Sequence, residues 1–232
     1  MHLKASYFSE DGRDARVEVG CDEVGRGALA GPVVAAAVIW NPEVCLLGDD
    51  EDTLWKYIRD SKKVTPARRG MLADYIKDTA VDFAVNAVSA DEIDTINILQ
   101  ATMKAMHQAL DDLRVDFDHI IVDGDKFKPY MPRVDTSVGF VPHTCIVKGD
   151  DTYLSIAAAS ILAKVSRDDT MCTLHASSDT LAVYDWAGNK GYGTRDHFAA
   201  IKTHGPVQGI HRQSFLKKCL ATNYHTTTVP QL

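Results

Sequence analysis

Cysteine is scarce in this sequence and forms no metal-binding or disulfide pattern. The 232 residues contain five cysteines, an odd number, and no two of them form a Cys-x-x-Cys pair. Disulfide-stapled domains use even sets of cysteines, and many structural zinc sites use such pairs, so both classes are disfavoured. We expect free thiols, most of them packed in the interior.

Long apolar runs are also missing. No stretch reaches the ~18 apolar residues of a membrane-spanning helix, and residues 1–20 carry charge instead of the apolar segment of a secretion signal. Hydrophobic residues make up 45% of the chain and charged residues 25%, as in ordinary globular proteins. We therefore expect a cytoplasmic protein that has no membrane partner and folds as one domain.

Positive charge is in deficit, since the formal net charge is -7. This argues weakly against a nucleic-acid partner, because phosphate binding depends on Lys and Arg. The charges are unevenly spread, however: residues 48–52 are acidic, whereas residues 190–218 contain Asp196 as their one acid. The basic residues of that segment are Lys190, Arg195, Lys202, Arg212, Lys217 and Lys218. A basic C-terminal face and an ordinary solvated helix face both fit this composition.

The hydrophobic pattern predicts an α/β domain. Alternating or continuous apolar residues predict strands over residues 16–22, 32–40, 81–88, 117–123 and 144–147. Helical spacing predicts a helical turn over 54–58 and helices over 66–77, 96–113, 155–165 and 195–203. Thr65 and Pro66 are expected to start the first helix, and Asp151 or Thr152 to cap the third. The first two strands should pair antiparallel, because their connection is short.

Two adjacent carboxylates, Asp22 and Glu23, end the first predicted strand beside a glycine-rich turn. Gly25, Gly27 and Gly31 let the backbone approach an oxyanion or a ribose closely, and Arg26 adds positive charge. A tight hairpin turn capped by solvated acids is the alternative interpretation. The rest of the chain has to decide between the two.

Two more carboxylates, Asp123 and Asp150, stand beside glycines at the end of a predicted strand and before a predicted helix. Neighbouring strand ends meet at one crevice in α/β folds, so these acids can converge with Asp22 and Glu23. Hard divalent cations such as Mg²⁺ or Mn²⁺ relieve the resulting repulsion, and two of them clamp a phosphoryl group during hydrolysis. The pattern favours a phosphodiesterase, with surface acids that merely flank turns as the alternative.

A series of motifs in residues 16–216 resembles the ribonuclease HII family. The matching segments are residues 22–27, 29–34, 60–63, 97–102, 122–124, 148–150, 155–165, 191–194 and 211–215, in family order. The resemblance implies a ribonuclease H-like fold, a mixed five-stranded sheet flanked by helices. It also implies a single catalytic domain over residues 16–219, helical from about residue 175, between flexible segments 1–15 and 220–232.

The activity that this resemblance implies is endonucleolytic hydrolysis of the RNA strand of RNA/DNA hybrids, with cleavage 5′ of ribonucleotides embedded in duplex DNA. Two Mg²⁺ or Mn²⁺ ions would serve the reaction, leaving 3′-hydroxyl and 5′-phosphate ends. The matching motif positions assign catalysis and metal binding to Asp22, Glu23, Asp123 and Asp150. They assign substrate binding to Gly25, Arg26, Gly27 and Tyr192, with Lys62 and Lys164 as further phosphate contacts and Arg167 and Asp168 as supports behind the metal ligands.

The chain departs from the family pattern at a few positions. Asp125 replaces the usual asparagine and either adds a charge near the site or, as we favour, points to solvent; Ala28 replaces a common proline. Residues 221–232 contain no sliding-clamp-binding motif, and we expect a monomer. Two rival functions remain: another nuclease of the same fold, and a catalytically silent hybrid-binding module.

Overall fold

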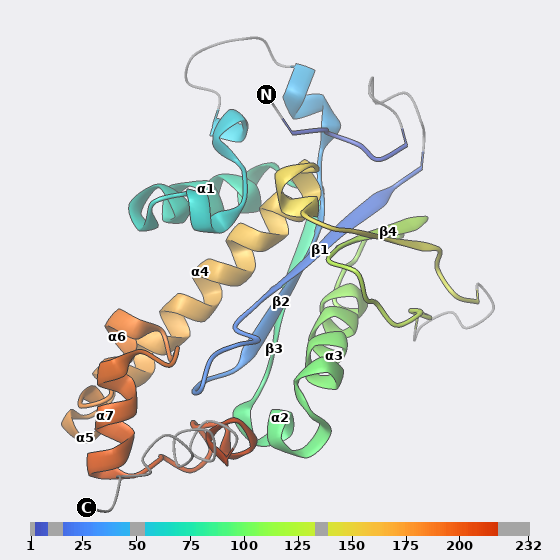
Figure 1. Ribbon diagram of the computed structural model, residues 1–232. Coiled ribbons are helices and arrows are strands. Elements are labelled where there is room, and N and C mark those ends of the chain that lie inside the picture. The colour runs from blue at the N-terminus through green and yellow to red at the C-terminus, as the bar shows by residue number, and fades with distance from the viewer. Residues whose placement is uncertain (1–2, 9–15, 47–53, 133–138, 218–232) are drawn as a thin grey trace, which may run out of the picture.

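A mixed five-stranded sheet forms the centre of the computed structural model, which describes residues 3–8, 16–46, 54–132 and 139–217 (Figure 1). The strand order is β3-β2-β1-β4-β5. β1 pairs antiparallel with β2, which pairs antiparallel with β3, whereas β4 runs parallel to both β1 and β5. The strands are β1 Glu18–Val24, β2 Val33–Ile39, β3 Asp82–Val88, β4 His119–Asp123 and β5 His143–Ile146. The predicted fold class is therefore confirmed.

Helices cover both faces of this sheet, and a helical cluster follows it (Figure 1). α1 (Pro66–Thr79) and α4 (Leu154–Ala176) lie on one face, and α2 (Ala90–Ile96) and α3 (Ile98–Asp111) on the other. The C-terminal cluster contains α5 (Asp179–Ala182), α6 (Trp186–Asn189) and α7 (Arg195–His204). Short 3-10 turns are η1 Pro42–Leu46, η2 Leu54–Tyr57, η3 Ser61–Lys63 and η5 Gly149–Asp151.

The strand β2 is buried throughout and contributes to two cores. Its even-numbered residues, such as Ala36, pack toward α1 and α4, and its odd-numbered ones, such as Ala35, pack toward α3. A third core lies between the glycine-rich segment after β1, the end of α4 and the C-terminal helices. It is made of Leu29, Ala30, Met171, Tyr184, Trp186, Ile201 and Leu216. That core anchors the glycine-rich segment after β1 to the helices that follow α4.

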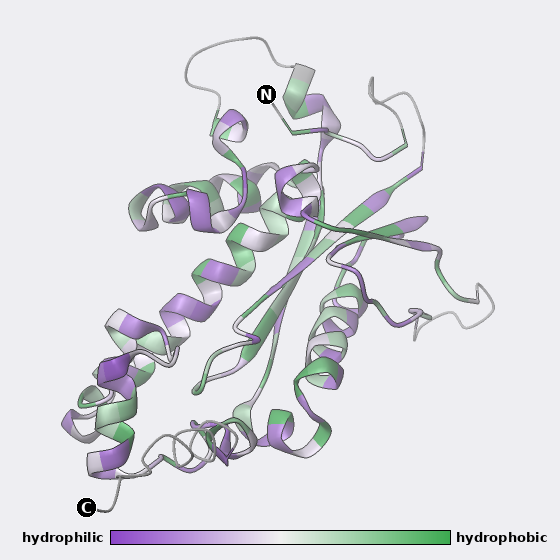
Figure 2. Cartoon of the chain, in the orientation of Figure 1, coloured by the Kyte–Doolittle hydropathy of each residue, from purple (hydrophilic) through white to green (hydrophobic). Residues whose placement is uncertain are grey.

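The helix α4 crosses the sheet closely because small residues face it. Its first turns are largely apolar and its later turns carry more polar residues (Figure 2). A Cβ on Gly20 of β1 would lie 2.4 Å from the backbone carbon of Ser155, so only glycine allows this approach. The same contact brings α4 alongside the end of β1, where the predicted carboxylates stand.

Three boundaries differ from the predictions. The helix expected over 96–113 begins at Ile98 and ends at Asp111, and the preceding helix α2 was not predicted. Asn97, whose φ of 68° ends α2, accepts hydrogen bonds through its side chain from two backbone amides at the start of α3. The helix expected over 155–165 continues to Ala176. The cap prediction there was wrong, because Tyr153 occupies the N-cap without a side-chain bond.

No helix in the described part of the chain is both long and apolar enough to cross a membrane. The acidic run 48–52, residues 220–232 and most of residues 1–15 lie outside the described residues. Predictions about those segments stay predictions.

Candidate active site

The parallel pairing of β1 with β4 brings the first carboxylates together. Cys21 pairs with Val122, so the next residue on each strand, Asp22 and Asp123, lies at the same sheet edge. β1 extends to Val24, two residues beyond the predicted end, and both carboxylates of the Asp22–Glu23 pair therefore belong to the strand. This convergence is what the sequence pattern predicted.

The fourth carboxylate, Asp150, reaches the same edge from the turn before α4. Lys148 adopts a left-handed conformation, and the amide of Gly149 then donates a 2.7 Å hydrogen bond to Asp123 Oδ1. Asp150 follows directly, and its electrostatic neighbours include Asp123. The turn therefore fixes Asp150 beside the β4 carboxylate.

Burial and mutual repulsion raise the pKa values of three of these acids. Asp22 is 5% exposed, and burial, with the charges of Glu23 and Asp123, raises its pKa well above the ordinary value. Burial, followed by Asp123, Asp60 and Asp151, raises the pKa of Asp150 to about 6. Burial also raises the pKa of Glu23. Arg26 opposes this last shift without cancelling it. The cluster is electrostatically unfavourable without a cation.

The donor set fits a hard divalent cation by its chemistry, since carboxylate oxygens are the ligands that such ions prefer. In the described residues, however, no group of three or more His, Cys, Asp or Glu side chains is positioned to hold a metal ion as it stands. One oxygen on each of three acids is already engaged: Asp22 Oδ1 by the Glu23 amide, Glu23 Oε1 by Arg26 Nη1 at 3.3 Å, and Asp123 Oδ1 by Gly149. A cation would replace or supplement these contacts.

The glycine loop, residues 25–31, lies beside the carboxylates and has a buried base and an open tip. Gly25 has a φ of +93°, and a Cβ there would lie 2.2 Å from Arg167 Nε, so both conformation and space require glycine. A Cβ on Gly27 would meet nothing within 4 Å, and both Arg26 and Gly27 are exposed. Nothing in the described structure explains a glycine at position 27, whereas a ligand close to the backbone does.

Two fully buried arginines hold this loop through its carbonyl groups. Arg167 donates to the carbonyls of Ala30, Pro32 and Lys190 over 2.8–3.0 Å. Arg212 donates to the carbonyls of Arg26 and Gly31, each at 3.0 Å. Burial lowers the pKa of both guanidinium groups, that of Arg212 to about 9. The conformation of the loop is therefore stabilised by two arginines that are far away in the sequence.

Tyr192 lies next to the same loop. The Gly191 carbonyl accepts hydrogen bonds from the amides of Leu29 and Ala30, and the Tyr192 ring lies over the Arg167 guanidinium at 5.3 Å. Its side chain is half-buried. The structure thus brings Tyr192 to the glycine loop, and its role in substrate binding stays a prediction.

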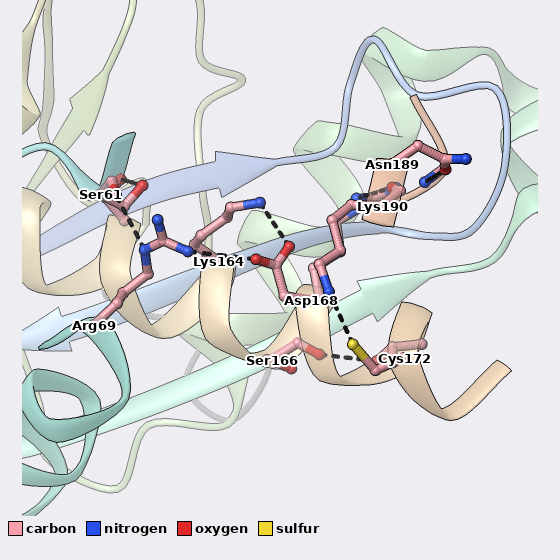
Figure 3. Close-up of polar contacts among 12 residues, drawn as sticks. Ser61, Arg69, Lys164, Ser166, Asp168, Cys172, Asn189 and Lys190 are labelled. Atoms are coloured by element: carbon pink, nitrogen blue, oxygen red, sulfur yellow. Dashed lines mark hydrogen bonds and ion pairs between the residues drawn. The ribbon is translucent and has the colours of Figure 1, made fainter. Parts of the chain in front are cut away.

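Lys164 and Asp168 belong to a network on α4 (Figure 3). Lys164 Nζ lies 2.6 Å from Asp168 Oδ1, and Arg69 lies 3.4 Å from the other oxygen while donating to the Ser61 carbonyl. Asp168 therefore supports Lys164 and Arg69 and does not contact the four carboxylates directly. Lys164 is one helical turn beyond Ser160, the residue that connects this network to the site.

Ser160 escaped the sequence interpretation. Its Oγ lies 3.0 Å from Ser61 Oγ, and its hydroxyl group donates to Asp22, which lowers the pKa of that acid against the larger effect of burial. The spacing from Ser160 to Lys164 places both residues on one helix face, and this was the available signal. Lys62, exposed on η3, reaches Asp150 electrostatically and lowers its pKa.

Other sequence expectations are resolved by burial. Asp125 is exposed at a groove that also has Glu23, Asp123 and Lys126 in its wall, as expected for a side chain facing solvent. Arg212 is buried and contributes nothing to a basic surface, so that part of the predicted basic face was wrong. Arg195, Lys202 and Lys217 are exposed, and Lys218 lies outside the described residues.

Comparison with known proteins gives consistent matches. The family model for ribonuclease HII matches residues 19–218. A ribonuclease HII of Phocaeicola vulgatus is 46% identical over 199 residues, which cover 86% of this chain and 89% of that protein. The fold is similar to that of ribonuclease H2 from Pyrococcus horikoshii OT3, with a TM-score of 0.64, 24% identity, and coverage of 90% of this chain and 99% of that one. It is also similar to Bst-RNase HIII, solved in complex with Mn²⁺, with a TM-score of 0.56, 20% identity, and coverage of 91% and 71%.

Proposed function

Because the chain belongs to the ribonuclease HII family and is thus a type 2 ribonuclease H, we propose that it hydrolyses the RNA strand of RNA/DNA hybrids and cuts 5′ of ribonucleotides embedded in duplex DNA, leaving 3′-hydroxyl and 5′-phosphate ends. One observation carries this proposal: four carboxylates converge beside a glycine loop whose tip is open.

The carboxylates of Asp22, Glu23, Asp123 and Asp150 hold the divalent cations in this proposal, either Mg²⁺ or Mn²⁺. When bound, two such ions supply an activated water and stabilise charge on the attacking and leaving oxygens. The raised pKa values of Asp22 and Asp150 support this assignment, because acids that are buried and also repel one another in the free protein are stabilised as carboxylates by a cation. Arg26 is the counter-charge of Glu23 until then.

Recognition of the ribonucleotide is assigned to the glycine loop and Tyr192. The exposed backbone at Gly27 can approach a 2′-hydroxyl, the group that separates RNA from DNA at a single site. Arg26 is free at the surface to turn from Glu23 toward a phosphate. Tyr192, next to the loop, offers an aromatic face on which a base or sugar at the RNA-to-DNA junction stacks.

Phosphates flanking the cut are assigned to Lys62 and Lys164. Lys62 is exposed near Asp150, and Lys164 is held on the face of α4 that also presents Ser160 to Asp22. The exposed Arg195, Lys202 and Lys217 extend positive charge along the C-terminal helices. A monomeric state, a cytoplasmic location and independence from a sliding clamp stay predictions.

The decisive experiment measures cleavage of a duplex that carries one ribonucleotide, with and without Mg²⁺, beside an all-DNA duplex. We expect metal-dependent cleavage of the first duplex alone. Cleavage of both duplexes would favour another nuclease of this fold, and binding without cleavage would favour a silent hybrid-binding module.

A matched pair of glycine variants tests the loop assignment. Gly27→Ala adds a methyl group in open space, so we expect unchanged thermal unfolding and a strong loss of cleavage. Gly70→Ala, in α1, also adds its methyl group where nothing lies within 4 Å; it should leave cleavage unchanged and raise thermal stability slightly, because alanine is favoured over glycine inside a helix. Full activity of Gly27→Ala would remove the loop from the substrate site.

A further inference from the structure

A buried line of hydrogen bonds ends on the backbone of Tyr192. His197 of α7 is fully buried, and its Nδ1 lies 2.8 Å from the Tyr192 carbonyl oxygen. Its Nε2 lies 3.1 Å from both Trp186 Nε1 and His211 Nε2. The Val207 amide donates to His211 Nδ1 at 2.8 Å. We call His197, His211 and Trp186 the histidine relay.

The partners at the two ends of the relay fix where its protons are. His211 Nδ1 accepts from an amide, so the ring proton of His211 is on Nε2 and is donated to His197. The Tyr192 carbonyl can only accept, so His197 Nδ1 carries a proton and donates it. His197 Nε2 is then the acceptor for both His211 and Trp186, and every ring nitrogen has one consistent role.

Both histidines must be neutral for this arrangement. Burial lowers the pKa of His197, and burial together with His197 lowers the pKa of His211 to about 4. A second proton on either ring would point an N–H at another N–H. The relay is therefore a directional contact that an apolar residue of the same size could not replace.

The Tyr192 end of the relay adjoins the glycine loop. Gly191 accepts from the amides of Leu29 and Ala30, and the Ile210 carbonyl, next to His211, accepts from the Gly31 amide. The Thr194 amide also donates to the Tyr192 carbonyl at 2.9 Å. The peptide that carries the tyrosine is thus fixed between the relay and the loop.

We propose that His197 is a positioning residue for Tyr192, which orients the aromatic ring for the RNA-to-DNA junction by holding the tyrosine carbonyl through Nδ1. This inference rests on the proposed function. It assigns His197 to selectivity for a single embedded ribonucleotide and gives it no part in metal binding or hydrolysis.

Two variants of His197 each keep the hydrogen bonds of one ring nitrogen and remove those of the other. In His197→Asn, the amide nitrogen takes the place of Nδ1 and keeps the donation to Tyr192. In His197→Gln, the amide oxygen takes the place of Nε2 and keeps only the acceptor for Trp186 and His211. We expect His197→Gln to lower kcat/KM on the single-ribonucleotide duplex by roughly threefold to thirtyfold, with a smaller loss on a continuous hybrid. This loss should be smaller than that of Tyr192→Ala, because the ring is still present. His197→Asn should stay within about threefold of wild type on both.

The double variant Tyr192→Ala/His197→Gln tests whether the effect passes through the tyrosine. It should lose no more than Tyr192→Ala alone, because residues that act through one another are not additive. The exposed His204→Gln, on the same helix, is the control and should be unchanged. Circular dichroism and thermal unfolding monitor the fold.

Several outcomes overturn the inference: equal losses for the Asn and Gln variants, equal losses on both substrates, or additive losses in the double variant. If His197→Gln does not fold, loss of single-ribonucleotide selectivity in a folded His197→Asn overturns it as well. Failure of the proposed function differs visibly, since wild type itself would then not cleave the single-ribonucleotide duplex.

Discussion

The carboxylate cluster and the glycine loop lie side by side and are built in opposite ways. The cluster brings like charges together, and its acids hold raised pKa values because burial and neighbouring carboxylates disfavour ionisation. The loop has buried arginines whose donors meet carbonyl groups, and its neighbour Tyr192 is held by a neutral histidine relay. The acids of one region repel one another in the free protein, whereas the carbonyl groups of the other already have donors.

Under the proposed function, this difference separates chemistry from recognition. A site that must bind a cation gains from stored repulsion, because the bound ion removes it. A site that must distinguish one hydroxyl group gains from rigidity, because its ordering cost is met during folding. The predictions below break the contrast at one region or the other, from the largest expected effect to the smallest.

Asp22→Asn should impair the carboxylate cluster and leave the glycine loop intact. We expect loss of metal-dependent cleavage on the order of a thousandfold or more, because a ligand charge is removed from the transition state. Folding should survive, and thermal unfolding without divalent cations should occur at a higher temperature, since repulsion in the cluster falls. Asp125→Asn, a neighbouring exposed acid, is the control and should keep its activity. Near-normal cleavage by folded Asp22→Asn would contradict the four-carboxylate assignment.

Arg167→Lys should destabilise the glycine loop. Lysine cannot reach the three carbonyls that Arg167 serves, and we expect a loss of about 3 kcal/mol in the free energy of unfolding from buried acceptors left without donors. Urea denaturation measures this change. Arg195→Lys, at a fully exposed position, should stay within about 0.5 kcal/mol of wild type. Equal stability of the two variants would mean that the carbonyl contacts do not stabilise the loop.

Tyr192→Ala should weaken recognition of the ribonucleotide without affecting the carboxylate cluster, and so distinguish the two regions. We expect a roughly tenfold to hundredfold loss of kcat/KM on a duplex with one ribonucleotide, as for other lost stacking platforms. The loss on a continuous hybrid should be smaller, since that substrate offers many registers. Equal losses on both substrates would reduce the ring to a packing role.

The histidine relay predicts a pH effect on stability that is the smallest of the four. His211 has a folded pKa of about 4, below its ordinary 6.5, so its neutral form stabilises the protein fully above pH 6.5 and this contribution is lost as the pH falls toward 4. Between pH 7 and pH 5.5 the loss should be about 1 kcal/mol. His211→Asn keeps an acceptor for the Val207 amide and should show a correspondingly flatter profile. Parallel profiles for the two proteins would contradict the neutral, buried histidine.

The convergence of the strand-end carboxylates was easier to predict from the sequence than the helices behind them. Asp22, Glu23 and Asp123 were readable because strand ends carry their own signals, an apolar run followed by acid and glycine. The extent of α4 was not, since the later turns of that helix are polar and show no clear apolar stripe. The start of α3 after Asn97 was also hidden, because a left-handed backbone at one residue leaves the helical spacing around it intact.

The sequence by itself determined the fold class, the carboxylates and the glycine loop, because each is encoded within a short stretch. Only the tertiary structure decided which distant residues complete them. Arg167 was expected behind the metal ligands and Arg212 in a basic segment, yet both are buried against the loop. His197 meets His211 only because α7 packs against the segment that carries His211. The physical reason is that buried polar groups must be satisfied, and their partners are chosen by which chain segments meet in space.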